Sequence, residues 1–329
     1  MSKLTFYGGV GEIGGNKILL EDQDTKIFLD FGMSFNQSGM YFSEFLMPRN
    51  CNGLGDYFET GLLPDLKGVY REDYLRHMGR SKEDQEIDAV LISHAHMDHM
   101  SYVHHLRKEI ELVMSPGSHA IMQTFQETRA GGQNDLLIQS PAFQIRPSKR
   151  GDSVTKVTKR DGYDTRPLNI FEYGKTFKVG DLDVVAYEVD HSLPGATAYL
   201  IHTSEGSILY TGDYRFHGYL GDKTREMIEQ VSKEDLSTVI TEGTRITTET
   251  GTTETEVYTH AKRLAENTKG LVVATFPVRD LTRLTTFYKI AKEVGRKLVI
   301  DFNQAYLLEQ YRKFSDRYPG SDDPNICLY

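Results

Sequence analysis

The segment from His94 to His99 gathers three histidines and one aspartate that could bind a metal ion. It follows the apolar segment 89–92, whose aliphatic residues predict a buried strand. In a helix these side chains would point in different directions, whereas a tight loop at a strand end can bring them together. Neutral imidazole and carboxylate groups bind zinc at about 2.0–2.2 Å. The sequence therefore predicts a metal site at His94, His96, Asp98 and His99.

The ligand types favour a catalytic metal over a structural one. Structural zinc sites are closed and usually rich in cysteine. The chain has two cysteines, Cys51 and Cys327, and both are far from the histidine segment in sequence. Histidine and aspartate ligands fit an open, catalytic site better, and a structural zinc site is the alternative.

Two further candidate ligands stand at the ends of predicted strands. His191 follows the strand expected over 182–189, and Asp213 follows the hairpin strand expected over 207–210. Because the edges of a stacked pair of sheets can bring remote segments to one rim, both side chains are candidates for the same metal site. His104, His105 and His119 are interpreted as structural, because adjacent helical residues face different directions.

A glycine-rich segment near the N-terminus contains the pattern GxGxxG at Gly9, Gly11 and Gly14. In dinucleotide-binding proteins this pattern opens a helix. Here 17–21 has no helical period and reads as a strand, so a dinucleotide site is not expected. We expect these glycines to permit tight turns and a close backbone approach near the metal site.

Composition and charge limit the class of protein. The chain has a net charge of −9, with 39% hydrophobic and 26% charged residues, which predicts a packed core. This charge weighs against a general nucleic-acid coating protein but allows a nuclease, which needs only a local groove. The sequence shows neither a membrane-spanning apolar run nor a signal peptide, and its cysteines are not expected to pair, which together indicate a cytoplasmic protein.

Positive charge concentrates in residues 131–175. Two interpretations are open: a solvated loop or hairpin, or an edge that contacts phosphate groups. The basic residues concerned are Arg146, Lys149, Arg150, Lys156, Lys159 and Arg160.

The pattern of predicted elements changes after Glu242. The first part of the chain alternates short strands with turns, with 101–110, 117–130 and 222–233 predicted as helices. The second part alternates helices and strands, as in an α/β parallel sheet. Its elements are expected as helices at 252–267, 278–294 and 303–316 and as strands at 271–276 and 297–302.

The segment His94-Ala95-His96-Met97-Asp98-His99 resembles the HxHxDH signature of the metallo-β-lactamase fold hydrolases. Segments 190–195, 210–214 and 241–244 extend this resemblance to the nucleic-acid-processing β-CASP branch, most of all to ribonuclease J and its archaeal relatives. The resemblance covers nearly the whole chain. It implies an αββα sandwich over residues 1–243 and the start of an α/β parallel-sheet β-CASP domain over residues 244–329.

The resemblance also implies roles for individual residues. His94, His96 and His191 would hold one zinc ion, Asp98 and His99 a second, and Asp213 would bridge them, with manganese as an alternative metal. Asp98 would accept a proton during attack by water. Glu242 matches the first acidic β-CASP motif, or is an ordinary carboxylate near a helix start. Asp30 would steady a metal ligand, or is a turn aspartate at a strand end.

The expected function is a zinc-dependent ribonuclease that hydrolyses single-stranded RNA, as an exonuclease, an endonuclease or both. The alternatives are a DNA-directed β-CASP nuclease, a small-molecule hydrolase of the same fold, and a non-enzymatic scaffold that binds nucleic acid. In the family the chain returns from the β-CASP domain to complete the first domain, and here it ends at Tyr329. We therefore expect a fragment, or a homo-oligomer or partner chain that supplies the rest, and weak activity from this chain alone.

Overall fold

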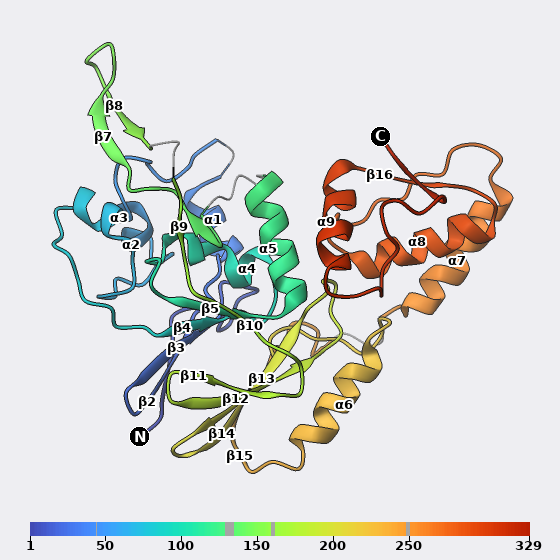
Figure 1. Ribbon diagram of the computed structural model, residues 1–329, viewed down its shortest axis with the longest axis horizontal. Coiled ribbons are helices and arrows are strands. Elements are labelled where there is room, and N and C mark those ends of the chain that lie inside the picture. Colours follow the sequence, from blue (N-terminus) through green and yellow to red (C-terminus); the bar gives the residue numbers. More distant parts are fainter. Residues whose placement is uncertain (44, 129–134, 159–161, 248–250) are drawn as a thin grey trace.

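The computed structural model describes residues 1–43, 45–128, 135–158, 162–247 and 251–329. Two β-sheets pack face to face, and helices cover the outer face of each sheet (Figure 1). This four-layer arrangement confirms the αββα architecture expected from the sequence. The first sheet has the order β1 (Lys3–Phe6), β2 (Ile18–Asp22), β3 (Thr25–Leu29), β4 (Ala89–Leu91), β5 (Glu111–Met114) and β10 (Leu168–Ile170). The second has the order β11 (Thr176–Val179), β12 (Leu182–Glu188), β13 (Thr197–Thr203), β14 (Gly206–Tyr210) and β15 (Leu236–Ile240).

Strand β4 shows how the sequence builds the layers. Successive side chains of a strand point to opposite faces of its sheet. Ala89 and Leu91 pack between the two sheets, whereas Val90 packs under the helices of the outer face. A strand covered on both faces needs apolar residues at every position, which explains the continuous apolar run before His94.

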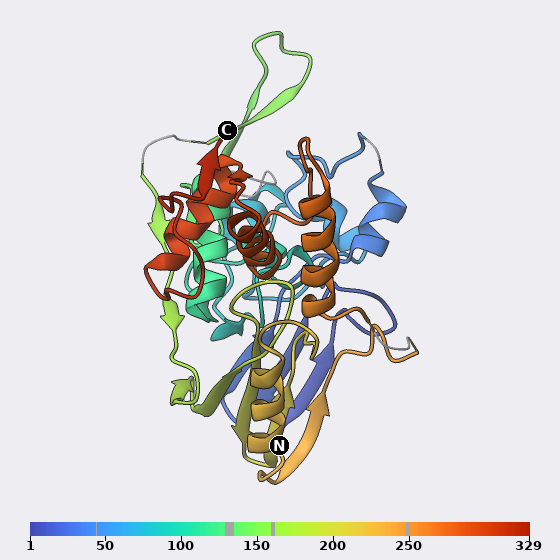
Figure 2. The same ribbon diagram turned by 90° about the vertical axis from the view of Figure 1, so that its right-hand side faces the viewer.

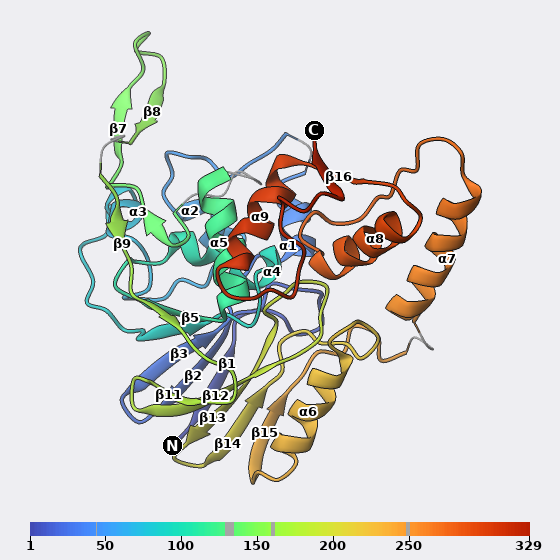
Figure 3. The same ribbon diagram turned by 45° about the vertical axis from the view of Figure 1, so that its right-hand side comes forward.

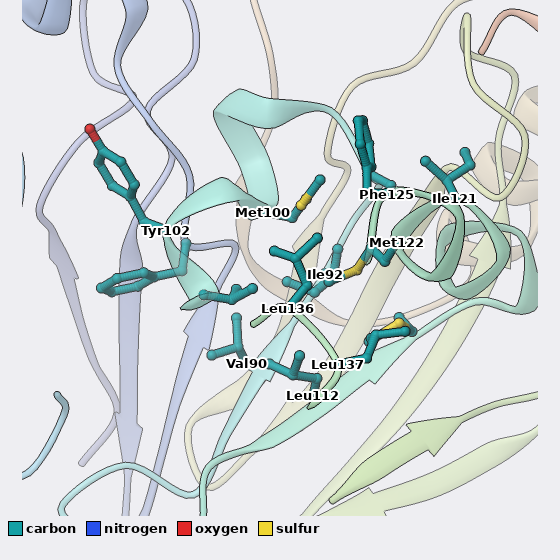
Figure 4. Close-up of a cluster of buried hydrophobic side chains, with 14 of the residues drawn as sticks. Val90, Ile92, Met100, Tyr102, Leu112, Ile121, Met122, Phe125, Leu136 and Leu137 are labelled. Carbon is teal, nitrogen blue, oxygen red and sulfur yellow. The ribbon is translucent and has the colours of Figure 1, made fainter. Parts of the chain in front are cut away.

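Helices and a 3₁₀ segment cover the outer face of the first sheet. Their core packs Ile121 and Phe125 near Met100 and Ile92 (Figure 4). These elements are α1 (Phe35–Tyr41), α2 (Gly55–Glu59), α3 (Glu72–His77), α4 (Met97–Met100), the 3₁₀ helix Ser101–His105 and α5 (Pro116–Thr128). The helix expected over 101–110 is therefore wrong in its extent, because the chain already turns helical at Met97 and ends as a 3₁₀ turn. The last two residues expected in α5 lie outside the described residues.

Helix α6 (Gly221–Val231) covers the second sheet. Met227 and Val231 on this helix pack against Ala198 and Leu209, which point outward from β13 and β14. The opposite faces of the same strands fill the space between the sheets with residues such as Tyr199. The last strand, β15, runs parallel to β14 and ends just before Glu242.

The C-terminal elements share a core with the first sheet's helical layer. They are α7 (Glu254–Asn267), α8 (Leu281–Glu293), α9 (Phe302–Arg312), and the parallel strands β16 (Leu298–Ile300) and β17 (Ile326–Leu328). Helix α9 lies beside α5 (Figure 3), and Leu307 and Leu308 belong to the same buried cluster as Ile121. The C-terminal elements are thus packed directly onto the sandwich.

The strand expected over 271–276 is wrong. These residues form neither a strand nor a helix, and Leu271 and Val273 are largely exposed. A strand exists through pairing, and within the described residues the only nearby ladder joins β16 to β17. Helix α8 also begins later than expected, because Asp280 caps it by accepting a hydrogen bond from the Arg283 N–H.

A two-stranded hairpin, β7 (Gln144–Pro147) and β8 (Val154–Val157), projects from the body (Figures 1 and 2). It carries the exposed Arg146, Lys149 and Arg150, so this part of the basic segment is a hairpin, and its contact with phosphate groups stays a prediction. Lys159 and Arg160 lie outside the described residues. A second small ladder joins β6 (Ile138–Gln139) to β9 (Asp164–Thr165).

Two further observations concern the chain as a whole. Cys51 and Cys327 both have free thiols. Among the described helices, none has the length and apolar character needed to span a membrane.

Candidate metal centre

The histidine segment lies in a loop that leaves β4 and turns into α4. Its backbone is held against the glycine-rich N-terminal segment and the end of β3. The Phe31 N–H donates to the carbonyl of His99 at 2.8 Å, and the Gly15 N–H donates to the carbonyl of Asp98 at 3.1 Å. These main-chain bonds fix the loop independently of its side chains, which leaves the imidazoles and carboxylate free to face one another.

Three imidazoles form a first set of candidate ligands. His94 Nε2 lies 2.9 Å from His96 Nδ1, and His191 Nε2 lies 3.1 Å from the same nitrogen. Zinc ligands at about 2.0–2.1 Å from a tetrahedral ion are roughly 3.3 Å apart. Burial lowers the pKa of all three histidines, to about 3 for His96 and about 4 for His191. The imidazoles are therefore in the neutral form that binds metals.

Asp213 lies between this set and His99. One oxygen, Oδ2, is 3.9 Å from His94 Nε2 and 3.8 Å from His191 Nε2. The other, Oδ1, is 3.5 Å from His99 Nε2. Burial alone would raise the pKa of Asp213, but its contacts with His99 and the other histidines lower the pKa to about 2. One oxygen of the ionised carboxylate thus faces the Nε2 atoms of two histidines, and the other faces the Nε2 atom of His99.

His99 and Asp98 form the second group with Asp213. Asp98 Oδ2 lies 3.8 Å from His99 Nε2. The donor atoms of His94, His99 and Asp213 all lie within 4.8 Å of one another, as do those of His94, His96 and His191, and neither of these sets includes Asp98. Burial raises the pKa of Asp98, and the neighbouring charge of His99 partly offsets that effect.

Asp30 orients His99 from behind. Its Oδ2 accepts hydrogen bonds from His99 Nδ1 at 2.7 Å and from the hydroxyls of Ser93 and Tyr210, and its Oδ1 accepts one from the Ser93 N–H. With Nδ1 bonded to Asp30, Nε2 is the nitrogen that faces Asp98 and Asp213. Burial would lower the pKa of His99, but the Asp30 and Asp213 carboxylates raise it well above its usual value. Asp30 therefore contacts a candidate ligand directly and is more than a turn residue.

The glycine-rich segment provides space for Asp98. A Cβ on Gly14 would lie 2.4 Å from the Asp98 carboxylate, and one on Gly32 would lie 1.8 Å from the Asp98 carbonyl oxygen. Gly14 also has a φ of +74°, which side chains rarely tolerate. Strand β2, not a helix, follows this segment, which agrees with the rejection of a dinucleotide site.

A pocket of about 560 Å³ opens onto Asp98, His99 and Asp213. The glycine-rich segment 9–14 forms one wall, and the segment 240–244 after β15 forms another. Glu242 lies in the second wall, where its carboxylate accepts hydrogen bonds from the N–H groups of Tyr214 (3.4 Å) and Thr244 (3.2 Å). The next described helix begins only at Glu254, so Glu242 does not sit at a helix start.

The structure thus brings all six predicted ligands together and places Glu242 in the adjoining pocket wall. His104 and His105 lie in a separate cluster of aromatic rings, and His119 lies beside Phe314. Sequence reasoning missed Tyr210, whose hydroxyl bonds Asp30, although this tyrosine begins the segment 210–214 that carries Asp213.

Sequence reasoning also missed how Asp190 holds the segment before His191. Its Oδ2 accepts hydrogen bonds from Arg215 Nε at 3.2 Å and from the Gly218 N–H at 2.7 Å.

Comparisons with known proteins agree with this architecture. Among curated proteins, a ribonuclease J of Pyrococcus abyssi is 24% identical over 314 residues, covering 91% of this chain and 58% of the relative. A ribonuclease J of Mycoplasma genitalium is 21% identical over 303 residues, covering 91% of this chain and 43% of the relative. The chain therefore spans about half the length of these relatives.

Among solved structures, a crystal structure of a protein of unknown function from Enterococcus faecalis V583 shares the fold. The TM-score is 0.72 at 24% sequence identity, covering 100% of this chain and 73% of the other. A family model described as a β-lactamase superfamily domain matches residues 63–251, more than half of the chain and the part that holds all six candidate ligands. With that match, a four-layer αββα fold and a His/Asp cluster at its rim, the chain belongs to the β-lactamase superfamily.

Proposed function

We propose that this chain carries the centre of a metal-dependent ribonuclease that hydrolyses phosphodiester bonds with an activated water molecule. The observation that carries the proposal is the position of Asp213. Its Oδ2 faces His94 and His191 at 3.8–3.9 Å while its Oδ1 faces His99 at 3.5 Å. A carboxylate whose two oxygens face different histidines is suited to bridge two metal ions.

The donor set fits zinc, with manganese as the alternative. Neutral imidazoles and ionised carboxylates are ligands for both metals, and the nitrogen separations in the first set are close to those of a tetrahedral zinc site. We assign His94, His96 and His191 to one ion, Asp98 and His99 to the other, and Asp213 to both. Two such ions would supply positive charge to a phosphate and lower the pKa of a bound water.

Three side chains of the protein have the other roles in the proposed reaction. Asp98 is placed to accept the proton of the attacking water at Oδ2. Asp30 holds His99 through Nδ1, so that Nε2 stays directed at the centre. Glu242 lines the substrate side of the pocket, fixed by two main-chain N–H groups, where it acts in proton transfer or positioning.

RNA as the substrate is supported by the curated relatives, which are named ribonuclease J in both an archaeon and a bacterium. The pocket beside the centre lies between two loop walls, segments 9–14 and 240–244, where a strand of RNA could approach Asp98, His99 and Asp213. We further propose that residues 244–329 begin a β-CASP domain packed on a metallo-β-lactamase domain of residues 1–243. Two free thiols support a cytoplasmic location.

The test combines metal content with cleavage. The full-length protein, purified without chelator, is expected to hold up to two zinc or manganese ions per chain by elemental analysis. It should cleave labelled single-stranded RNA, lose that activity with a chelator, and regain it with zinc or manganese. Absence of bound transition metal after reconstitution would contradict the centre. Cleavage of DNA but not of RNA of the same sequence would leave the centre intact and contradict the substrate.

A further inference from the structure

The two segments that carry His191 and Asp213 leave strands that are not neighbours in the second sheet. Segment 189–196 follows β12 and segment 211–215 follows β14, whereas β13 lies between these two strands. Neighbouring strands are spaced by about 4.7–4.9 Å, so the sheet alone leaves β12 and β14 roughly 9–10 Å apart. His191 Nε2 nevertheless lies 3.8 Å from Asp213 Oδ2. The two segments must therefore be tied together beyond the ends of their strands.

A bridge between Asp190 and Arg215 makes this tie. The two residues pair in the antiparallel sense, and the Arg215 N–H donates to the Asp190 carbonyl at 2.7 Å. Asp190 directly precedes His191, and Arg215 is two residues beyond Asp213. The width of this bridge therefore affects the separation of the two candidate ligands.

The second hydrogen bond of the bridge passes through a side chain of helix α6. In a hydrogen-bonded antiparallel pair, the two residues exchange both of their N–H···O bonds. Here the Asp190 N–H donates to Thr224 Oγ1 at 2.9 Å, and the Thr224 hydroxyl donates to the Arg215 carbonyl at 3.0 Å. The hydroxyl is thus inserted between the two main-chain groups and holds them further apart than a direct hydrogen bond would.

The position of this hydroxyl is itself fixed. Thr224 and Asp190 are both 0% exposed, so bulk water does not compete for their hydrogen bonds. Met227 and Val231 on the same helix pack against the second sheet. As a β-branched residue in a helix, Thr224 also has few side-chain rotamers. Helix α6 therefore presents the hydroxyl to the bridge at a defined place.

We propose that Thr224 is a positioning residue of the metal centre, which sets the separation of His191 and Asp213 through its hydroxyl. Without the hydroxyl, the Asp190 N–H and the Arg215 carbonyl have two options. They stay unpartnered, which loosens the bridge, or they close on each other, which shifts the two ligands. This inference rests on the proposed function, because it assigns a role in holding the metal that the proposed reaction uses.

The experiment compares Thr224→Val, Thr224→Ala and Thr224→Ser with the parent, all as full-length proteins. Valine keeps the shape of threonine and removes the hydroxyl, whereas serine keeps the hydroxyl. Competition with a chromophoric chelator measures the zinc affinity of each site without any cleavage. Loss of a group that supports metal ligands costs about 10- to 100-fold in affinity, so Thr224→Val should weaken the ion at His94, His96 and His191 by at least about 10-fold. Thr224→Ser should keep the parent's affinity.

The matched control is Thr124→Val. Thr124 on α5 is also buried, and its hydroxyl donates to the Ala120 carbonyl of the same helix at 2.8 Å. This change should leave all zinc affinities unaltered. Melting temperature is measured for every variant, and affinities are compared per folded molecule. If Thr224 only stabilises the fold, Thr224→Val will lower the melting temperature and leave the zinc affinities unchanged, which overturns the proposal.

Thr224→Ala keeps the proposal testable if Thr224→Val does not fold. Alanine leaves space that a water molecule can fill in place of the hydroxyl, so its zinc affinity should lie between those of the serine and valine variants. Equal zinc affinities for Thr224→Ala and Thr224→Ser overturn the proposal.

Metal binding and cleavage together separate this inference from the proposed function. A parent protein that binds neither zinc nor manganese contradicts both. A parent that binds metal but cleaves no RNA contradicts the ribonuclease assignment, and the comparison of Thr224→Val with Thr224→Ser still decides the positioning role. A parent that cleaves RNA, with zinc affinities shared by all Thr224 variants, supports the assignment and contradicts the positioning role.

Discussion

Two pairs of histidines, His94 with His96 and His104 with His105, are alike in their burial and in the direction of their pKa shifts. They differ in the atoms that surround them. His94 is 0% exposed and His105 is 3% exposed. Burial lowers the pKa of all four imidazoles. Neither low exposure nor a lowered pKa therefore distinguishes the candidate ligands from the other pair.

The neighbouring atoms do distinguish them. Nitrogens of the first pair face one another, His191 and the carboxylate of Asp213. The rings of the second pair pack against Tyr57, Tyr74 and Tyr102, and both nitrogens of His105 lack a partner within the described parts of the chain. Convergence of nitrogens with carboxylates is thus the feature that indicates a metal site here, and the predictions below test it from the largest expected effect to the smallest.

The largest effect is expected from Asp98→Asn in the full-length protein. The change keeps the size and one oxygen of the side chain but removes its charge, so both proton acceptance and metal ligation suffer. A positioned proton acceptor contributes about 10²–10⁴-fold, and we expect RNA cleavage to fall by at least about 100-fold. The melting temperature should stay near the parent's, because the loop is held by main-chain bonds such as that from the Gly15 N–H to the Asp98 carbonyl, which the change leaves in place. Cleavage rate and melting curve are measured on one preparation.

The structural-zinc alternative makes the opposite forecast for this variant. If the metal only holds the fold together, Asp98→Asn lowers the melting temperature strongly and leaves normal activity per folded molecule. That result would contradict the catalytic role of Asp98. The pair His94 and His96 would then have a structural role, as His104 and His105 do.

Asp30→Asn should have an intermediate effect, confined to one metal. The amide presents N–H groups where Asp30 now accepts from Ser93, His99 and Tyr210, so His99 loses its charged support. Removing such an orienting partner costs about 10- to 100-fold in metal affinity. Competition with a chromophoric chelator should therefore show one weakened zinc per chain, while the ion at His94, His96 and His191 keeps its affinity. Two ions of unchanged affinity would show that Asp30 does not orient a ligand.

The smallest effect is expected from His105→Phe, which leaves the centre alone. Phenylalanine fills a similar space among the tyrosine rings and removes two buried nitrogens without partners, so we expect a gain of about 1 kcal/mol in the free energy of unfolding. Zinc content and RNA cleavage should match the parent's. Loss of a metal ion in this variant would contradict the division between the two histidine pairs.

The same variant has a pH signature. Burial holds the pKa of His105 well below 6.5 in the folded protein, whereas the unfolded chain binds a proton near pH 6.5. The parent's free energy of unfolding therefore falls as the pH drops below about 6.5, by up to about 1.4 kcal/mol per pH unit for this one site. Denaturant titrations between pH 7 and pH 5 should give a flatter profile for His105→Phe. Parallel profiles would show that His105 titrates freely in the folded state.

Much of the sandwich and the location of the candidate site could be predicted from the sequence, because both depend on local signals. The apolar run before His94 is a strand buried on both faces, and the spacing of His94, His96, Asp98 and His99 requires a loop. The arrangement of Asp213 between two groups could be expected only through the family resemblance. That arrangement depends on how β14 meets β4 across the two sheets, which no local pattern encodes.

The errors came from contacts between distant parts of the chain. Residues 271–276 have the composition of a strand but lack a pairing partner among the described residues, so propensity alone could not decide their state. The contact between Arg279 and Phe125 was equally hidden, because the two residues are 154 positions apart in the sequence. Such a contact becomes visible only when the segment before α8 is placed against α5.

The glycine-rich wall of the pocket, segment 9–14, limits which of its residues can be replaced without disturbing the centre. Gly14 belongs to the surface that a substrate would touch, yet its missing side chain also makes room for Asp98. A Cβ at this position would lie 2.4 Å from the Asp98 side chain, so a larger residue there would disturb Asp98 as well as the pocket surface. The neighbouring Val10 and Ile13 are about two-thirds exposed and bear no such constraint. Natural variation or engineering of specificity has its freedom at these two side chains and at the positions of the opposite wall, 240–244, other than Glu242.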